Sequence, residues 1–360
     1  MTFVARTRAS SLTLDQEPHS ISNNLGGDRN FTSDQKDVIL DRIPDSGWRA
    51  NLQGAVPALG LTFNRFAFHA TVEASEYYNA PRDVIKLAFL GNELDRNYRI
   101  LDFTGDNQIY ADYSAGFGYP FEQEWISELS FGAAFHFYQG LAMTKLVQTE
   151  GGLTFTDTTT IGSGVIHAVE STSGDGVGFD LGMVARFTDE WQAGLAVRQL
   201  GARIAWQVHE NRLISFYTDS TGINVESYRR YNSLREGLHW QDMTYGGGSI
   251  ETILAPVIQL NGRYHPHPKW SVLGDMSARL RKSVKGPSGL DVSVAAIYRT
   301  LPWLVLQSGI GAGNLWGARF GVGTGLRFKY YEMDGGWSWN GGLFNNARGV
   351  AFGLTQRLQF

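Results

Sequence analysis

Apolar and polar side chains alternate with a period of two along most of this chain. Near its C-terminus, Val350, Phe352 and Leu354 alternate with small or polar residues. Residues 129–138 and 317–331 repeat the same pattern. Successive side chains of a β-strand point to opposite faces, so this period predicts strands with one apolar and one polar face.

The predicted strands are longer than those of soluble β-proteins, and their polar face has an unusual composition. Many alternating segments exceed about 10 residues, whereas strands of globular proteins average about 5–6. The polar face is rich in Gly, Ala, Ser and Arg. Tilted strands of about 9–11 residues cross a bilayer with an apolar face toward lipid. The sequence therefore predicts an all-β fold, a transmembrane antiparallel β-barrel, as one domain over residues 1–360. A soluble all-β protein, extractable without detergent, is the alternative.

Short turns are expected at one end of the barrel, each followed by an aromatic residue. We place them around residues 64–65, 122–124, 188–190, 266–268 and 301–302. Trp125, Trp191, Trp270 and Trp303 follow four of these turns. An aromatic at one depth after each turn is typical of an interfacial girdle. We therefore assign this end to the periplasm.

Counting the alternating segments gives about 14 strands, an even number as in bacterial single-chain barrels. The predicted spans are 2–14, 46–63, 66–76, 107–120, 126–146, 175–188, 191–206, 250–265, 270–283, 290–300, 303–313, 317–331, 335–344 and 347–360. Longer connections are expected at 76–106, 147–174, 206–250 and 284–289. Short helices are predicted in the N-terminal region at 33–42 and in one outer loop at 82–90.

Composition narrows the class of protein further. A net charge of −4 argues against a nucleic-acid binder. The chain has no cysteine, which excludes disulfides, thiolate metal sites and a Cys nucleophile. The chain contains no run of about 18 apolar residues, so the sequence predicts no transmembrane helix. Residues 1–15 lack the apolar core of a signal peptide, so we expect the targeting segment to precede Met1.

Several segments resemble known outer-membrane proteins. The last strand, ending in Phe360, resembles the terminal signal that bacterial outer-membrane barrels present to their insertion machinery. The strand count resembles the FadL-type transporters of long-chain fatty acids and other hydrophobic molecules. Four segments resemble an uncharacterised branch of FadL-like barrels, which is related also to the accessory barrel of type IX secretion. These segments are SSLTLD at 10–15, DVILDRIPDSGW at 37–48, LGLTFNRFAFHATVEA at 59–74 and DVIKLAFLGNELDRNYRI at 83–100.

This resemblance implies a multi-pass, porin-like barrel in the outer membrane of a Gram-negative cell, in contact with lipid and with the insertion machinery. FadL-type proteins also carry an N-terminal hatch, usually with an Asn-Pro-Ala motif, that plugs the barrel. That motif does not occur in this sequence. We expect the hatch either to precede Met1 or to be missing.

Basic side chains outnumber acidic ones on the predicted lumen face. Glu73, Asp112, Asp180, Asp275 and Asp291 are the inward acidic candidates. A cavity lined by one sign of charge attracts the opposite sign, and arginine binds carboxylates through two hydrogen bonds. Two interpretations stay open: a path for a hydrophobic or anionic amphiphilic ligand, or a cross-strand ladder that fills the barrel. The ligand-binding candidates are Arg198, Arg263, Arg279, Arg281, Arg299, Arg319, Arg327, Lys329 and His136.

Other motifs indicate no catalytic or metal chemistry. The glycine runs at 309–313 and 321–325 do not complete a dinucleotide-binding motif, and they indicate close strand packing. His265 and His267 lie in a proline-containing turn, so we predict no metal site there. No G-x-S-x-G nucleophile motif is present. We therefore expect neither enzyme activity nor a cofactor.

Two functions remain as hypotheses. The first is passive transport or binding of hydrophobic or amphiphilic small molecules in the outer membrane. The second is a structural or accessory barrel that anchors a secretion or surface protein complex. A protein partner would bind the tyrosine-rich connection at 206–250, because aromatic and Arg residues are enriched at interaction hot spots.

Overall fold

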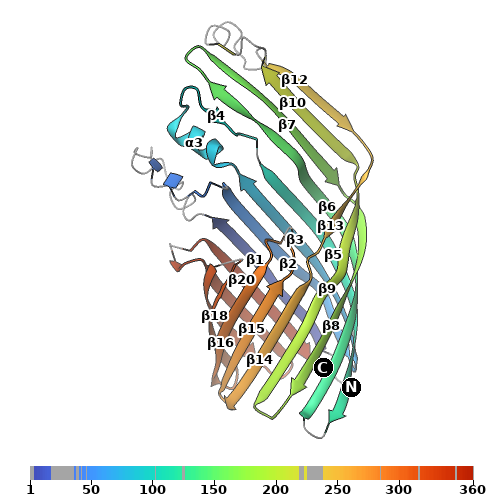
Figure 1. The fold of residues 1–360 in the computed structure, drawn as a ribbon. Helices are drawn as coiled ribbons and strands as arrows, with labels where there is room; N and C mark the ends of the chain where they lie inside the picture. The colour runs from blue at the N-terminus through green and yellow to red at the C-terminus, as the bar shows by residue number, and fades with distance from the viewer. Residues whose placement is uncertain are drawn as a thin grey trace.

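The computed structural model describes residues 4–17, 36–37, 40–41, 43–45, 47–101, 103–123, 126–218, 223–224, 238–283, 285–314, 317–344 and 347–359. Most of these residues lie in antiparallel β-strands that form one strongly curved sheet (Figure 1). The prediction of an all-β antiparallel fold is therefore confirmed.

Fourteen of the strands follow one another around the sheet, and each pairs antiparallel with the next. The first strand, β1, pairs with β2 on one side and with the last strand, β20, on the other. In pairing order these strands are β1 (Val4–Glu17), β2 (Trp48–Phe63), β3 (Phe66–Ala80), β5 (Thr104–Gln123), β6 (Ile126–Phe155), β8 (Gly174–Arg186), β9 (Trp191–Gln207), β14 (Val257–His267), β15 (Trp270–Arg279), β16 (Gly289–Leu301), β17 (Leu304–Gly313), β18 (Gly317–Arg327), β19 (Tyr331–Asn340) and β20 (Gly349–Gln359).

Two predicted connections contain strands of their own, which corrects the sequence prediction. The segments at 147–174 and 206–250 hold the far half of β6, β7 (Thr159–Ser171), β10 (Glu210–Thr218) and β12 (Leu238–Tyr245). β10 pairs with β7 on one side and with β12 on the other. We call this four-stranded projection, formed by β6, β7, β10 and β12, the extension (Figure 1). The prediction missed it because both segments were interpreted as long connections between barrel strands.

Three further short strands complete the sheet. They are β4 (Asn97–Tyr98), β11 (Ile223–Asn224) and β13 (Ser249–Ile253). β13 pairs with the C-terminal part of β9, whereas β14 pairs with its N-terminal part, and residues 254–256 separate β13 from β14. The end of the predicted span at 317–331 is also corrected: β18 ends at Arg327, and Tyr331 begins β19 instead.

One helix, α3 (Arg82–Leu90), lies over one end of the barrel, where the sequence predicts a helix. Ile85 and Phe89 of α3 pack against Leu40 and Ile43, which are almost fully buried. The described residues 36–37 and 40–41 are helical as predicted, and the rest of the predicted 33–42 helix lies outside the described residues. In the described part of the chain, no helix is both long and apolar enough to cross a membrane.

The two ends of the barrel differ in their connections. At one end lie the short turns at 64–65, 187–190, 268–269, 302–303 and 328–330, and we call this the turn end. At the other end lie α3 and the extension, and we call this the helix end (Figure 1). The predicted turns at 64–65, 188–190, 266–268 and 301–302 all fall at the turn end, within a residue or two.

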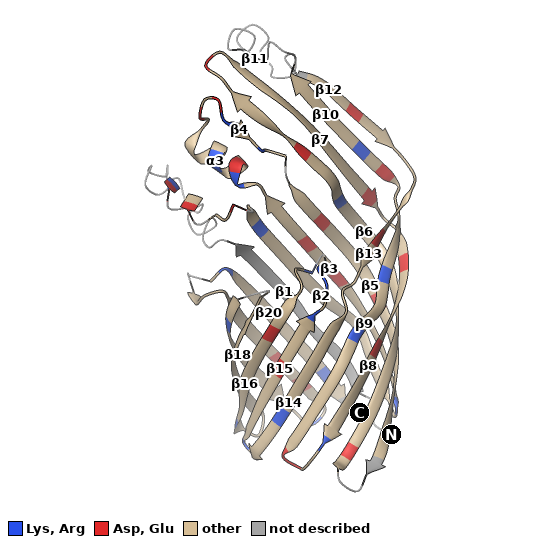
Figure 2. Cartoon of the chain, viewed as in Figure 1, with Lys and Arg blue, Asp and Glu red and all other residues tan. Residues whose placement is uncertain are grey.

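The outer face of the sheet exposes large apolar side chains. Phe179, Leu181 and Ile310 are 51%, 53% and 66% exposed, respectively. Their neighbours Asp180 and Gly311 alternate with them and face the interior. Charged residues are spaced along the strands, with long uncharged stretches between them (Figure 2). The alternation in the sequence therefore corresponds to an apolar outer face and a more polar inner face.

A hydrophobic core fills one side of the interior near the helix end. Its centre is Trp206, whose indole N–H donates a hydrogen bond to Thr252 Oγ1 at 3.1 Å. Gly140 faces this ring so closely that a Cβ at that position would overlap it. The buried members of the core are Tyr110, Tyr138, Met143, Val169, Ala202, Ile204, Trp206, Val208 and Leu254.

β9 is irregular where it passes this core. Gln199 and Gly201 adopt positive φ values of 58° and 61°. The register with β8 shifts there, and the pairing of β9 passes from β14 to β13 across residues 254–256. Bulges bend a strand and aim its side chains anew. This bend directs Ala202, Ile204 and Trp206 into the interior, where they are almost completely buried.

Candidate ligand path through the interior

A cavity of about 340 Å³ opens on the inner face at the turn end. Its wall includes the side chains of Arg263 on β14, Arg299 on β16 and Arg327 on β18. Three of the predicted ligand-binding residues therefore lie around one cavity. The remaining lining is His265, Pro268, Lys269, Ser271, Leu273, Ile297, Val305, Glu332, Asp334 and Arg357.

Two of the arginines in this turn-end cavity are paired with carboxylates of β19. Arg327 Nη2 lies 2.6 Å from Asp334 Oδ1, and Arg357 Nη1 lies 3.0 Å from Glu332 Oε2. Gly325 lies beside the first pair, and a Cβ there would overlap the Asp334 carboxylate. The glycine run at 321–325 thus leaves room for a charged pair on the inner face, in agreement with the close packing expected from the sequence.

Arg263 and Arg299 form no ion pair with any other residue in the described part of the chain. Both are exposed on the inner face, and both line the turn-end cavity. His265 beside them shares a hydrogen bond of 2.6 Å between its Nδ1 and Ser271 Oγ. The cavity therefore offers two guanidinium groups to an anion, next to apolar wall contributed by Leu273.

A second charged group lies deeper in the barrel, around His136 on β6. His136 Nδ1 lies 2.9 Å from Asp112 Oδ1, and His136 Nε2 lies 3.4 Å from Asp180 Oδ2. Arg198 Nε lies 3.4 Å from the same Asp180 oxygen. The other Asp180 oxygen accepts a hydrogen bond of 2.7 Å from the Gln199 backbone N–H, which the β9 bulge positions.

His136 and Arg198 are thus embedded in carboxylates from neighbouring strands. Asp112 comes from β5 and Asp180 from β8. A side chain whose charge is already neutralised attracts a charged ligand only weakly. This group has the form of the cross-strand ladder that the sequence leaves open as the second interpretation.

A third charged group joins β15, β16 and β18 toward the helix end. Arg319 Nη2 lies 3.6 Å from Asp291 Oδ1, and Arg279 at the end of β15 faces the same carboxylate. β17 lies between β16 and β18, so the Arg319–Asp291 contact must pass over it. It can do so because Gly311 and Gly313 carry no side chain on the inner face, and a Cβ at Gly313 would overlap Asp291.

The connection from β15 to β16, residues 280–288, reaches across the interior to the opposite wall. Lys285 Nζ forms an ion pair with Glu73 Oε2 of β3. Gln53 Nε2 of β2 donates a hydrogen bond of 2.6 Å to the Lys285 carbonyl. Tyr110 Oη donates to the same Glu73 oxygen at 2.8 Å. We call this inward connection, residues 280–288, the crossing loop.

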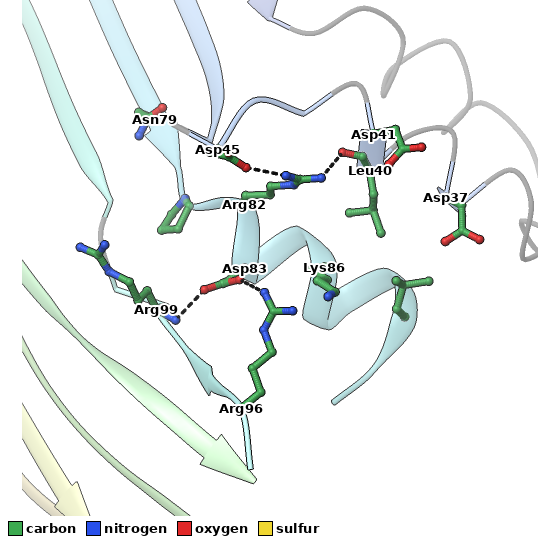
Figure 3. A pocket seen from close by; sticks show the side chains of 12 residues that line it. Asp37, Leu40, Asp41, Asp45, Asn79, Arg82, Asp83, Lys86, Arg96 and Arg99 are labelled. Carbon is green, nitrogen blue, oxygen red and sulfur yellow. Dashed lines mark hydrogen bonds and ion pairs between the residues drawn. The ribbon is translucent and has the colours of Figure 1, made fainter. Parts of the chain in front are cut away.

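The helix end holds a larger cavity of about 720 Å³ between α3 and the residues before β2 (Figure 3). Several of its charged side chains are paired. Arg82 Nη1 lies 2.6 Å from Asp45 Oδ1, and Arg96 Nη2 lies 2.8 Å from Asp83 Oδ1. The backbone N–H of Arg99 donates to the other Asp83 oxygen at 3.0 Å. The pairs tie α3 to the chain on both sides of it.

Glu93, just after α3, belongs to the same charged network. Lys86 Nζ lies 2.6 Å from one Glu93 oxygen, and Arg96 Nη1 lies 3.1 Å from the other. The hydrogen bond from Lys86 has the largest effect and lowers the pKa of the Glu93 carboxyl below its ordinary value. The hydrogen bond from Arg96 lowers this pKa further. Glu93 therefore stays ionised at neutral pH and holds the end of the helix to the following loop.

Two predicted ligand-binding residues lie in connections and not in the strands to which the sequence pattern assigned them. Arg281 is exposed in the crossing loop, beyond the end of β15. Lys329 is exposed in the turn between β18 and β19, with its Nζ 4.8 Å from the centre of the Tyr330 ring. The alternation was extended past the ends of β15 and β18, where the chain leaves the strand.

The tryptophans predicted for the girdle lie where the strands leave the turn end. Trp191, Trp270 and Trp303 are about half exposed. Trp191 stacks on Tyr264 with ring centroids 4.2 Å apart, and Trp270 contacts Tyr298 at 4.5 Å. Trp125 and Phe360 lie outside the described residues. The girdle and the terminal insertion signal stay predictions.

Sequence reasoning missed the crossing loop and its contact with Glu73. The alternation of side chains predicted that Glu73 faces the lumen. Lys285 lies in a predicted connection, for which the sequence indicated no contact. The two residues are 212 positions apart. No local pattern reports such a contact, because it depends on how the barrel curves.

Comparison with known protein families identifies a matching family for this sequence. A family model described as a family of unknown function, DUF5723, matches residues 13–166 and 166–334. The sequence matches no curated protein.

Three solved structures share the fold over nearly the whole chain. The toluene transporter TodX of P. putida has a TM-score of 0.51 at 11% identity, with 99% of this chain and 88% of that chain covered. A Pseudomonas aeruginosa FadL homologue has a TM-score of 0.52 at 12% identity, covering 99% and 90%. A deltaS2S3 mutant of TodX, described as a monoaromatic hydrocarbon channel, gives 0.54 at 11%, covering 99% and 89%. The chain therefore has a FadL-like β-barrel fold.

Proposed function

The chain belongs to the family of unknown function DUF5723, and from that premise we propose that it is an outer-membrane barrel that binds amphiphilic anions and passes them through its interior. The observation that carries the proposal is the turn-end cavity, in which two guanidinium groups have no ion-pair partner among the described residues, inside a wall whose outer face is apolar. TodX, which shares the fold, is described as a toluene transporter.

The proposal includes a closed barrel of 14 strands that spans the bilayer as a single domain. The pairing of β1 with both β2 and β20 supports closure. Strands such as β15 and β17, with 10 residues each, match the length that crosses a bilayer. An outer face with exposed Phe179, Leu181 and Ile310 along it would be unstable in water, because large apolar patches drive association.

We place the turn end in the periplasm and the helix end outside the cell. Trp191, Trp270 and Trp303 support a membrane interface at the turn end, since they are about half exposed and lie next to the turns. Tryptophan is favoured at the membrane–water interface because its ring is apolar and its N–H is polar. The short turns and long helix-end connections have the distribution of outer-membrane barrels.

The ligand class follows from the composition of the turn-end cavity. Arg263 and Arg299 can bind a carboxylate or another small anion through their guanidinium groups. Leu273, Ile297 and Val305 line the same cavity and offer apolar surface to a hydrocarbon chain. A volume of about 340 Å³ lies within the range of small-molecule sites. An amphiphile with an anionic head would satisfy both parts of this wall.

The other predicted residues divide between the two interpretations. We propose that Arg198, Arg279, Arg319 and His136 belong to the charged ladder that stiffens the barrel, because their partners are carboxylates of other strands. Arg327 contributes to both, since it pairs with Asp334 and still lines the turn-end cavity. Passage from the helix-end cavity to the turn-end cavity then requires the crossing loop to move.

The experiment is binding of radiolabelled dodecanoate to the full chain in lipid nanodiscs, with empty nanodiscs as the background. We expect saturable binding to the wild type. The double variant Arg263→Ala/Arg299→Ala should bind dodecanoate at least about tenfold more weakly, because a charge-assisted hydrogen bond contributes about 1.5–3 kcal/mol. Dodecanol, which has the same chain without the charge, should be much less sensitive to the two substitutions.

A matched control is Arg203→Ala, which removes an arginine that pairs with Glu251 at 3.4 Å, away from the cavity. It should bind dodecanoate like the wild type. Absence of saturable binding to the wild type, or equal losses in the double variant and the control, would overturn the proposal.

A second candidate function is the accessory barrel that anchors a protein complex. The extension supports it, because Tyr217, Trp240, Met243 and Tyr245 on β10 and β12 are between 42% and 55% exposed. Phe216 stacks on Trp240 on one face of the β10–β12 pair, and Tyr217 stacks on His239 on the other, so the surface of the extension carries aromatic rings on both faces. Crosslinking in intact cells followed by purification should capture a protein partner through this surface if the barrel is an anchor.

A further inference from the structure

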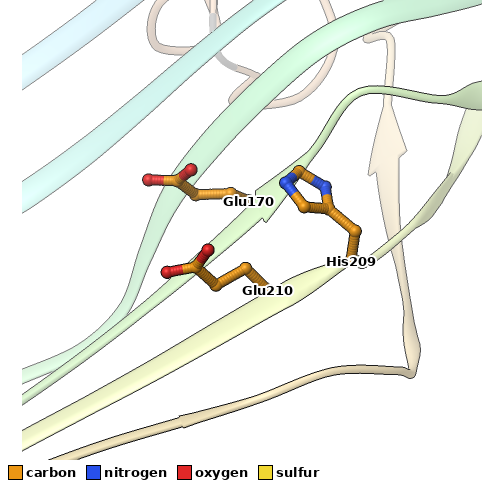
Figure 4. A group of neighbouring side chains, drawn as sticks. All are labelled: Glu170, His209 and Glu210. Atoms are coloured by element: carbon orange, nitrogen blue, oxygen red, sulfur yellow. The ribbon is translucent and has the colours of Figure 1, made fainter.

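Glu170, His209 and Glu210 meet where the extension joins the barrel (Figure 4). Glu170 is the second-last residue of β7, and Glu210 is the first residue of β10. His209 lies in the short connection between β9 and β10. One ligand atom from each side chain lies within 4.8 Å of the other two.

The backbone that carries these three side chains is held in place by pairing. Glu170 and Glu210 are direct partners in the antiparallel register of β7 and β10. The backbone N–H of His209 donates to the Glu170 carbonyl at 3.1 Å. Asn211, which follows Glu210 on β10, is buried, and its Nδ2 donates a hydrogen bond of 2.8 Å to the Gly247 carbonyl. The three donors are therefore presented together from a fixed backbone.

Glu170 and Glu210 have no ion-pair partner within the described part of the chain, although the charge of Arg212 on β10 acts on both. Like charges directly opposite each other on paired strands destabilise the pair. Arg212, two positions along β10, binds Asp242 with both Nε and Nη2, at 3.2 Å and 2.8 Å. No described residue forms an ion pair with Glu170 or Glu210. A bound cation would remove this repulsion.

We propose that Glu170, His209 and Glu210 bind a divalent first-row transition ion such as Zn²⁺, which fastens the extension to the barrel. One imidazole nitrogen and two carboxylate oxygens form a donor set suited to Zn²⁺ rather than to Ca²⁺ or Mg²⁺, which prefer oxygen alone. Zn²⁺ binds such donors at about 2.0–2.2 Å, so the side chains must move slightly closer together. Glu170 and His209 are exposed and free to do so, and water completes the coordination.

The ion would hold β7 to β10 at the base of the extension. The four described strands of the extension are joined by the pairing of β6 with β7, of β7 with β10 and of β10 with β12, and the two-residue strands β4 and β11 pair with β6 and β7 farther from this base. A metal clip at Glu170 and Glu210 would therefore reduce opening of the extension without affecting the barrel strands below it. This role is independent of the turn-end cavity.

The test is titration of ZnCl₂ into the purified, EDTA-treated full chain in detergent micelles, followed by calorimetry. We expect one high-affinity site per chain. Glu170→Gln and His209→Ala should each weaken Zn²⁺ binding at least tenfold. The matched control Glu150→Gln removes an exposed carboxylate on the β6 strand of the extension and should leave binding unchanged. Heat-modifiable gel mobility would verify that each variant is a folded barrel.

Hydrogen exchange gives a second readout that does not depend on affinity alone. Zn²⁺ should slow exchange of backbone amides in 159–171 and 208–218 in the wild type and not in His209→Ala. The proposal is overturned if the wild type binds no stoichiometric Zn²⁺, if Glu170→Gln and His209→Ala bind it like the wild type, or if Glu150→Gln loses as much as they do.

Discussion

Lys285 of the crossing loop forms an ion pair with Glu73 on the opposite side of the barrel. In one direction around the sheet, β5, β6, β8, β9 and β14 separate β3 from β15. In the other, β2, β1, β20, β19, β18 and β17 separate β3 from β16. The pair therefore spans the interior, and Gln53 holds the Lys285 carbonyl from the same wall. A connection between two strands thus extends into the interior and contacts the opposite wall.

The first prediction concerns this ion pair as a closure of the interior. Lys285→Ala should free the crossing loop from Glu73 and raise single-channel conductance in planar lipid bilayers severalfold. The measurement is the conductance of the reconstituted full chain. Lys329→Ala, which removes an exposed lysine from a turn-end turn, is the control and should conduct like the wild type.

A charge exchange separates closure from general loosening. The double variant Glu73→Lys/Lys285→Glu restores an ion pair between the same two positions, so its conductance should return toward that of the wild type. Conductance that stays high in the double variant, or never rises in Lys285→Ala, would show that the pair does not close the path.

The second prediction concerns Gly140 and Trp206. Gly140→Ala places a Cβ inside the van der Waals radius of the Trp206 ring, which is fully buried and hydrogen-bonded to Thr252. The ring must shift within a packed core, and we expect a loss of about 1–3 kcal/mol in the free energy of unfolding. Urea titration of the refolded barrel measures it.

Gly274→Ala is the matched control for that substitution. Gly274 also lies within a strand, but a Cβ there would have no atom within 4 Å. Its unfolding free energy should stay within about 0.5 kcal/mol of the wild type, or rise slightly. Equal losses at Gly140 and Gly274 would mean that glycine flexibility, and not contact with Trp206, explains the effect.

The third prediction tests which face meets lipid. Leu181→Arg, in the middle of β8, should reduce the unfolding free energy in lipid vesicles by about 2–4 kcal/mol, because an arginine at mid-bilayer depth is poorly solvated. Phe187→Arg, one residue beyond the turn-end terminus of β8, lies near the proposed interface and should cost only about 0–1 kcal/mol. Equal costs at the two positions would contradict the proposed placement in the membrane.

The alternation of residues such as Val350, Phe352 and Leu354 was enough to predict most of the fold. Side-chain period in a strand is a local property, so the strand positions, the turns at 64–65 and 188–190, and the helix at 82–90 follow from neighbouring residues alone. The extension was missed because local alternation continues through β7 and β10 without indicating that they pair with each other.

The candidate sites depended much more on the tertiary structure. Arg263, Arg299 and Arg327 were predicted to face the lumen, but their meeting around one cavity results from the pairing of β14 to β18. Partners for Arg319 and Arg327 come from other strands, whereas the sequence offered no acid on their own strand. His209 and Glu210 are adjacent in sequence, yet only strand register brings Glu170 to them.

Local residue order thus decides the strands, their apolar and polar faces, and the turns, because side-chain direction alternates along any extended chain. Curvature and register decide which inner side chains meet, whether a charge is paired, and where a connection such as the crossing loop ends. Those contacts join residues as far apart as Glu73 and Lys285, and their formation depends on the curvature of the whole sheet.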